Sequence, residues 1–153
     1  MQQAIEILEQ IRATNAVPKL FPNQPLFMNL GELIAHSPFS PLIAASLHLW
    51  NDDLDNCHRI VQQRELPNEN YLHAILHRRE KDFSNSLYWY RRVGKHPVLK
   101  KLESGAYDWT PIEFVAACEE FSKARTYSEP REKKLREWQA TEMLLLFNHL
   151  LEA

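Results

Sequence analysis

Residues 53–61 read DLDNCHRIV and residues 82–90 read DFSNSLYWY, so the two stretches align without a gap at a spacing of 29 residues. Each begins with an aspartate, continues with an apolar residue and has an asparagine at its fourth position. An aspartate directly before an apolar helical pattern is typical of a helix N-cap. Each copy is therefore predicted to begin the second helix of a hairpin, and the spacing indicates two stacked helical hairpins.

The pattern continues outward from these hairpins along the whole chain. Apolar residues recur at helical spacing, most of the nine prolines fall between such segments, and three glycines are few for a turn-rich β protein. Gly94 and Pro97 are predicted to end the helix of the second copy. Helices are expected over residues 2–14, 26–35, 41–50, 54–64, 70–80, 84–93, 111–125 and from 130 onward. The fold class predicted is all-α, with about seven or eight helices in a single domain, residues 1–153, whose terminal helices cap the central hairpins.

Composition limits the class of protein. With 153 residues, 44% hydrophobic and 25% charged, the chain has the size and balance of one globular domain. Cys57 and Cys118 have no metal-binding or CxxC spacing, so we expect core thiols in a reducing compartment. The first residues lack the features of a signal peptide, and no uninterrupted apolar stretch is long enough for a transmembrane helix. A cytoplasmic protein without a membrane segment is predicted.

Positive charge is concentrated in one window. The net charge is only −2, yet residues 78–101 contain eight Lys or Arg against two acids. Tyr88 and Trp89 lie among these cations, and on a helix they fall with Arg92 away from the apolar stripe. Surface aromatics beside arginines can stack on bases, or the arginines can hold a carboxylate. We expect a peptide, a protein or a small anion as partner and consider nucleic acid less favoured; the alternative is that the aromatics pack beneath the next helix.

A second pattern suggests metal chemistry. His73, His77 and Glu80 have the i, i+4, i+7 spacing that places them on one helix face. Two imidazoles and a carboxylate are ligand types that suit zinc or iron, and His58 on the core side of its own helix could approach as a further ligand. No cysteine or second HxxxH supports the site, and an exposed face with these residues is common without a metal.

Two family resemblances accompany these patterns. Asp82, Phe83, small Ser86, Tyr90 and the later proline resemble the back half of a tetratricopeptide repeat, although the spacing of 29 is shorter than that family's 34. The chain also resembles an uncharacterised, mainly bacterial family with HAI, HRRE, YW, VG and HP in order, which stand here at residues 73–75, 77–80, 88–89, 93–94 and 96–97. The first implies stacked helical hairpins, and the second implies no activity, cofactor or catalytic residue.

Two functions are therefore predicted from the sequence. The first is a non-enzymatic binding or scaffold domain, either monomeric or homodimeric, with a basic and aromatic groove for a peptide carboxylate or small anion. The residues expected to line this groove are His73, His77, Arg78, Tyr88, Trp89, Arg92 and His96. The alternative is a metal-dependent or histidine-based enzyme that uses the face formed by His73, His77 and Glu80. No catalytic residue or cofactor is identified by a motif of established chemistry.

Overall fold

The computed structural model describes residues 1–153 and contains helices but no strands. The helices are α1 Gln2–Thr14, α2 Leu30–Ala35, α3 Pro41–Trp50, α4 Leu54–Val61, α5 Pro67–Arg79, α6 Phe83–Val93, α7 Pro97–Leu102, α8 Pro111–Lys123 and α9 Glu129–Glu152. The all-α prediction is confirmed. The short helix α7 was not anticipated, because Pro97 begins a helix as well as ending the segment before it.

Local sequence explains where the helices begin. A proline occupies the first turn of α3, α5, α7, α8 and α9, where its missing N–H costs no hydrogen bond. The Asp53 and Asp82 side chains accept hydrogen bonds from the backbone N–H of Asn56 and Asn85, respectively. These two caps confirm the assignment of both aspartates to helix N-termini.

The two hairpins, α3–α4 and α5–α6, share one turn geometry. The N–H of Asp53 donates to the His48 carbonyl, and the N–H of Asp82 donates to the His77 carbonyl, both at 2.9 Å. The residue before each aspartate has a positive φ, 58° at Asp52 and 62° at Lys81. The spacing of 29 in the sequence therefore corresponds to a repeated structural unit.

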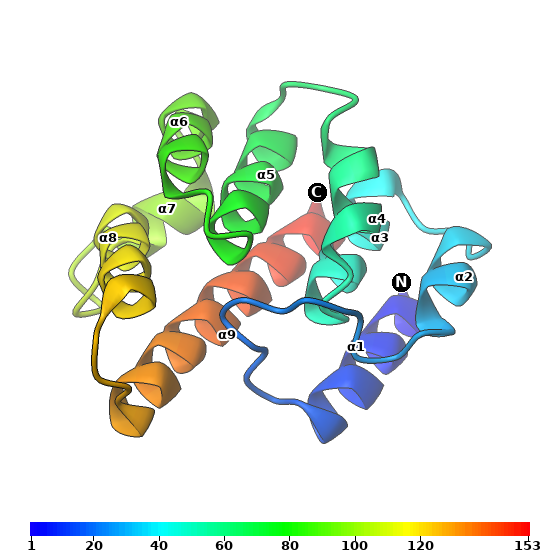
Figure 1. Ribbon diagram of the computed structural model, residues 1–153. Coiled ribbons are helices and arrows are strands. Elements are labelled where there is room, and N and C mark those ends of the chain that lie inside the picture. Colours follow the sequence, from blue (N-terminus) through cyan, green and yellow to red (C-terminus); the bar gives the residue numbers. More distant parts are fainter.

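Helix α5 lies at the centre of the molecule, between the first hairpin and α6 (Figure 1). Every residue from Glu69 to Arg79 is buried, so nearly the whole helix is enclosed by its neighbours. Helix α9 runs diagonally behind the hairpins and packs against α3, α7 and α8 (Figure 1). One cluster of 34 buried apolar residues draws on all nine helices.

Most of the apolar face of α9 is buried against other helices of the chain. Met143, Leu146 and Phe147 are almost completely buried in the core. The broad apolar surface of this helix therefore reflects, for the most part, contacts with several neighbouring helices, while Leu144, Leu145 and Leu151 stay partly exposed.

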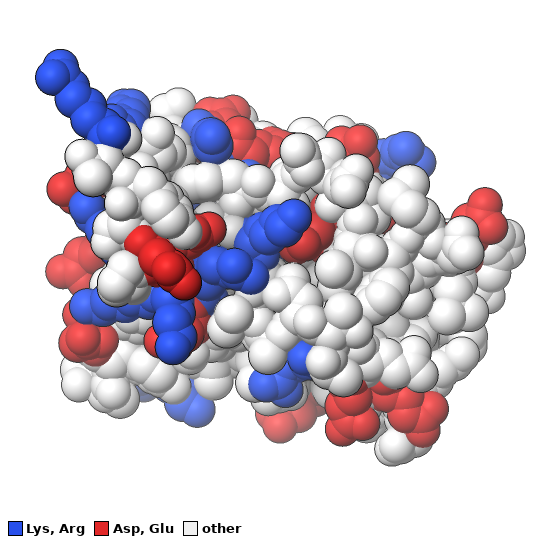
Figure 2. Space-filling model, turned by 60° about the horizontal axis from the view of Figure 1, so that its bottom comes forward, with Lys and Arg blue, Asp and Glu red and all other residues white.

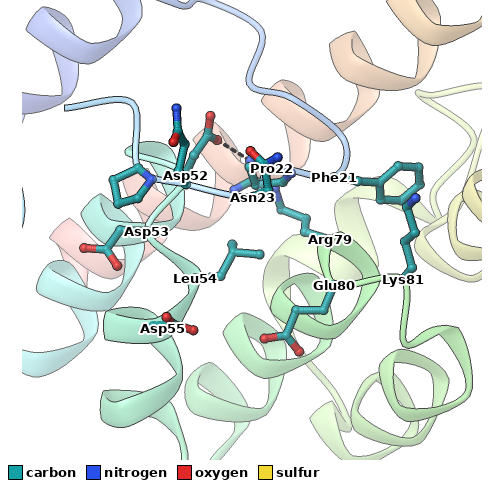
Figure 3. Close-up of a pocket in the computed structure, with 12 residues that line it drawn as sticks. Phe21, Pro22, Asn23, Asp52, Asp53, Leu54, Asp55, Arg79, Glu80 and Lys81 are labelled. Atoms are coloured by element: carbon teal, nitrogen blue, oxygen red, sulfur yellow. Dashed lines mark hydrogen bonds and ion pairs between the residues drawn. The ribbon is translucent and has the colours of Figure 1, made fainter. Parts of the chain in front are cut away.

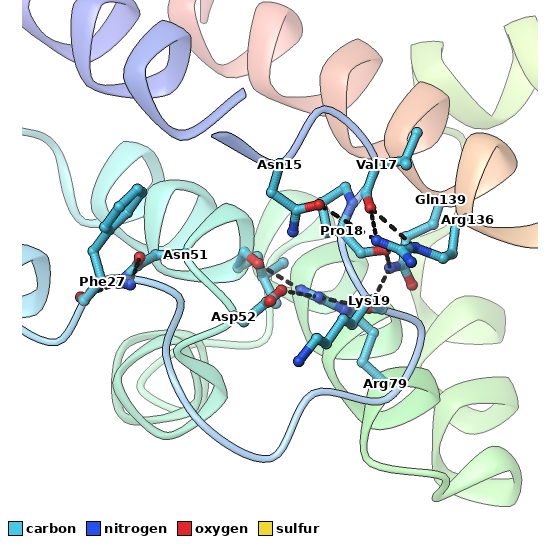
Figure 4. A network of polar contacts seen from close by, with 11 residues as sticks. Asn15, Val17, Pro18, Lys19, Phe27, Asn51, Asp52, Arg79, Arg136 and Gln139 are labelled. Carbon is cyan, nitrogen blue, oxygen red and sulfur yellow. Dashed lines mark hydrogen bonds and ion pairs between the residues drawn. The ribbon is translucent and has the colours of Figure 1, made fainter. Parts of the chain in front are cut away.

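The segment between α1 and α2 crosses the molecule as an extended strap (Figures 1 and 4). Arg136 and Gln139 of α9 donate hydrogen bonds to the carbonyls of Val17 and Lys19, respectively, and Arg79 of α5 also donates to the Lys19 carbonyl. Because side chains from two helices bind its backbone, the strap is held in place without secondary structure of its own.

Other features bear on the earlier predictions. None of the helices combines the length and the apolarity needed to cross a bilayer. Cys57 and Cys118 are buried free thiols, as expected. Burial raises the pKa of the Cys118 thiol to about 12, so it stays protonated at neutral pH.

Candidate functional site

Three histidines from two helices meet beside α5. His73 and His77 are one turn apart on α5, and His58 projects toward them from α4. The Nε2 atoms of His73 and His58 are 3.1 Å apart, and one ring nitrogen from each histidine lies within 4.8 Å of the others. The prediction that His58 approaches from the neighbouring hairpin is therefore confirmed.

The spacing of these nitrogens is close to that of a metal site. Two histidine nitrogens bound to a tetrahedral zinc ion at about 2.05 Å are about 3.3 Å apart. The His58 and His73 pair already has this separation, and the third nitrogen needs only a shift of about 1–2 Å, within the reach of a side-chain torsion. Without an ion, the same pair forms an N–H···N hydrogen bond.

The second nitrogen of His77 lies beside two carboxylates. Its Nδ1 is 3.1 Å from Glu80 Oε2 and 3.7 Å from Asp82 Oδ2, but it is buried and its geometry completes no hydrogen bond. A metal bound at Nε2 would leave Nδ1 protonated, and a small adjustment would let this N–H donate a hydrogen bond to Glu80. Glu80 therefore lies beside His77 and is not among the three residues whose ligand atoms converge, so its direct coordination of a metal stays a prediction.

Burial and stacking fix the orientation of His73. Its ring stacks on Trp89 of α6 with centroids 4.1 Å apart and an interplanar angle of 14°. Burial, with smaller effects from His77 and His58, lowers the pKa of His73 to about 4. The imidazole is therefore neutral at pH 7, which is the protonation state that binds a metal.

A pocket of about 340 Å³ opens beside the three histidines. It is lined by His58, Gln62, Arg64, Glu65, His73, His77, Asn85 and Trp89. Arg64 and Glu65 were not predicted as site residues, because they lie in the irregular connection between α4 and α5 and belong to no motif. The histidines therefore form one wall of an open pocket.

Two residues of the predicted groove lie elsewhere. The Arg78 guanidinium is fully buried and bonds to Glu142 and the Tyr90 hydroxyl, each at 2.7 Å. His96 caps α7 and forms a hydrogen bond with Asn68. Neither lines the pocket, because Arg78 points from α5 toward α9 and His96 is a helix cap; the expected single groove is corrected in this respect.

The remaining groove residues surround the pocket in a different way than expected. Trp89 is half-buried, and one face of its ring stacks on His73. The Arg92 guanidinium lies 5.9 Å from the centre of the Trp89 ring. Arg92 also forms an ion pair with Glu65, and Tyr88 is exposed at its side. Trp89 therefore supports a histidine and does not present a free stacking platform.

The concentration of positive charge is weaker in the structure than in the sequence. Arg78 and Arg79 are buried in ion pairs, so two of the eight cations of the window never reach solvent. Figure 2 shows Lys and Arg interleaved with Asp and Glu on one face of the molecule, without a continuous basic surface.

A cavity of about 520 Å³ lies beneath the strap, between Phe21–Pro25 and the two hairpin turns (Figure 3). Two of its four acidic residues are held by protein partners. Asp52 pairs with Arg79, and Asp53 pairs with His48. This cavity therefore has fewer free ligating groups than its acidic lining suggests.

The structure thus defines an all-helical protein with paired hairpins and a three-histidine pocket. No family model, no curated protein and no solved structure matches the chain.

Proposed function

We propose that this protein binds a divalent transition metal ion through His58, His73 and His77. The observation that carries the proposal is the convergence of three ring nitrogens within 4.8 Å, from two helices, at the wall of an open pocket. Neutral imidazoles suit zinc, copper, nickel or iron(II) better than magnesium or calcium, which prefer oxygen ligands.

The surroundings support a metal more than a purely structural histidine cluster. Three imidazoles beside one another would repel if protonated, and burial already keeps His73 neutral by lowering its pKa. Glu80 is positioned to accept a hydrogen bond from a protonated Nδ1 of His77, as carboxylates behind zinc-bound histidines do. The site therefore has both the ligands and an outer partner.

An open side makes the site suited to chemistry. Three protein ligands with a free fourth position are typical of catalytic zinc, whereas structural zinc is usually enclosed by four protein ligands. The pocket beside the histidines would leave that position accessible to water or a small ligand. A metal-dependent enzyme, the alternative drawn from the sequence, is therefore favoured over a passive scaffold.

The binding groove predicted from the sequence has less support. Arg92 is already paired with Glu65, and Arg78 is enclosed in the core. Recognition of a peptide carboxylate by these arginines would require the first pair to break. The pocket can still accept an anionic ligand, but residues other than Arg78 and Arg92 would have to bind it.

The test is a titration of the metal-free protein with Zn²⁺ and Co²⁺ by calorimetry and visible absorption. We expect one ion per chain and an intense cobalt spectrum typical of four-coordinate geometry. His58→Ala, His73→Ala and His77→Ala should each weaken binding by roughly 100-fold or more, because losses behind the ligands alone cost 10–100-fold. Glu80→Gln should fall in that smaller range.

His36→Ala is the matched control, since His36 is exposed at the C-cap of α2 and belongs to no cluster. It should bind metal as the unmodified protein does. Equal affinities for this control and the three site variants would contradict the proposal, as would the absence of stoichiometric binding at neutral pH.

A further inference from the structure

The charges around the pocket indicate what occupies the open side of the metal; this inference rests on the proposed function. Two charged side chains line the pocket with the histidines, Arg64 and Glu65. Glu65 is neutralised by its ion pair with Arg92 of α6. The charge of Glu65 is thus not available to repel an anion.

Arg64 is the unpaired cation of the pocket. It is exposed, and its guanidinium makes no hydrogen bond or ion pair with the protein. A planar guanidinium offers a fork of N–H donors that matches a carboxylate or a phosphate. A divalent ion at the histidines would add two positive charges to the same pocket, next to Glu80 and Asp82, which lie beside His77.

We infer that the ligand is a small molecule with an anionic oxygen group, carboxylate or phosphate, held between the metal and Arg64. The metal would accept one oxygen at its open position, and Arg64 would bind another oxygen of the same ligand. A volume of about 340 Å³ is at the small end for ligand pockets and fits a compact molecule. Asn85 also lines the pocket, and its amide nitrogen donates to Asp82.

The experiment uses the Co²⁺-loaded protein, titrated separately with acetate and inorganic phosphate while the visible spectrum of the cobalt is recorded. We expect a saturable spectral change with at least one anion, and the tighter of the two identifies the preferred oxygen group. Arg64→Gln should weaken that anion about tenfold, as expected for loss of a charge-assisted hydrogen bond, without changing cobalt affinity.

Arg59→Gln is the matched control, because Arg59 is an exposed arginine near Arg64 in the sequence that does not line this pocket. A spectrum that neither anion changes would overturn the inference while leaving the metal site intact. Equal weakening in Arg64→Gln and Arg59→Gln would also overturn it, since the effect would then be one of general charge. Failure to bind cobalt would overturn the metal site and this inference together.

Discussion

The two hairpins have the same turn but use equivalent residues differently. In α3–α4, His48 is buried and its Nδ1 lies 3.2 Å from Asp53, the cap of the following helix. In α5–α6, the equivalent His77 completes no hydrogen bond at Nδ1 and faces His58 and His73. One histidine holds a turn, whereas the other is left available at a pocket.

The next two positions differ more strongly. Leu49 and Trp50 of the first hairpin fill the core, while their equivalents Arg78 and Arg79 bury two guanidinium groups there. Arg79 ties the strap and the first turn to α5 by bonding to the Lys19 carbonyl and Asp52. The second hairpin therefore combines the site with the polar connections that organise the rest of the fold.

The largest effect should come from making the second hairpin resemble the first. Arg78→Leu introduces the residue found at the equivalent position 49 and leaves Glu142 as a buried unpaired charge. We expect a loss of about 3–5 kcal/mol in the free energy of unfolding, measured with urea. Adding Glu142→Leu should recover about 2 kcal/mol, because the stranded charge is removed. If Arg78→Leu alone were as stable as the unmodified protein, the ion pair between Arg78 and Glu142 would not stabilise the fold.

The two equivalent histidines should separate stability from metal binding. His48→Leu removes the buried partner of Asp53 and should cost about 2–3 kcal/mol, while His77→Leu should cost less than about 1 kcal/mol because Nδ1 makes no hydrogen bond. In thermal unfolding with Zn²⁺, the His48 variant should still be stabilised by the ion and the His77 variant should not. If Zn²⁺ stabilised His77→Leu but not His48→Leu, then His48 and not His77 would be the metal ligand.

Acid should weaken the second hairpin before the first. The folded-state pKa of His73 is lowered to about 4 by burial, so the unfolded chain binds more protons between pH 6.5 and 4. Stability is therefore greatest above pH 6.5 and is lost as the pH falls toward 4. His96 should lower the stability in acid in the same way, because burial, together with the nearby His149, lowers its pKa to about 4.

Burial alone would raise the pKa of Asp53, but hydrogen bonds from His48 and Asn56 outweigh this effect, and the pKa is lowered. The contribution of Asp53 to the free energy of unfolding is therefore lost only below about pH 3.8. Urea unfolding of the metal-free protein at pH 7.5 and 5 should differ by about 1–2 kcal/mol, after allowance for solvent screening. In His73→Gln the difference should shrink by about half. An unchanged difference in this variant would exclude His73 as a source of the acid sensitivity.

The smallest effect concerns the shared turn. Lys81 has a φ of 62°, which is unfavourable for a residue with a Cβ atom. Lys81→Gly should relieve this strain and raise the free energy of unfolding. The gain should be only about 0.5 kcal/mol, because glycine has more entropy in the unfolded chain and the contact of Lys81 with the Phe21 ring is lost. Lys100→Gly, within α7, is the control and should lower it by about 1 kcal/mol. Equal losses in both variants would mean that the turn carries no strain.

Several parts of the site could be predicted from the sequence. Helical spacing placed His73 and His77 on one face, and the alignment of the hairpins brought His58 toward them. The role of Glu80 could not be predicted, because i+7 spacing defines a face but not which nitrogen of His77 the carboxylate meets. The burial of Arg78 was also missed, since its partner Glu142 is 64 residues away.

By itself, the sequence determined the all-α class, most helix starts and the repeated turn, because caps, prolines and apolar periodicity act over a few residues. Only the tertiary structure decided which polar groups are enclosed and which remain free. Arg78, Arg92 and Arg64 are alike as side chains, yet one is buried against α9, one pairs with Glu65 and one is left at the pocket. The difference arises because burial and ion pairing depend on neighbours distant in the chain, which no local pattern specifies.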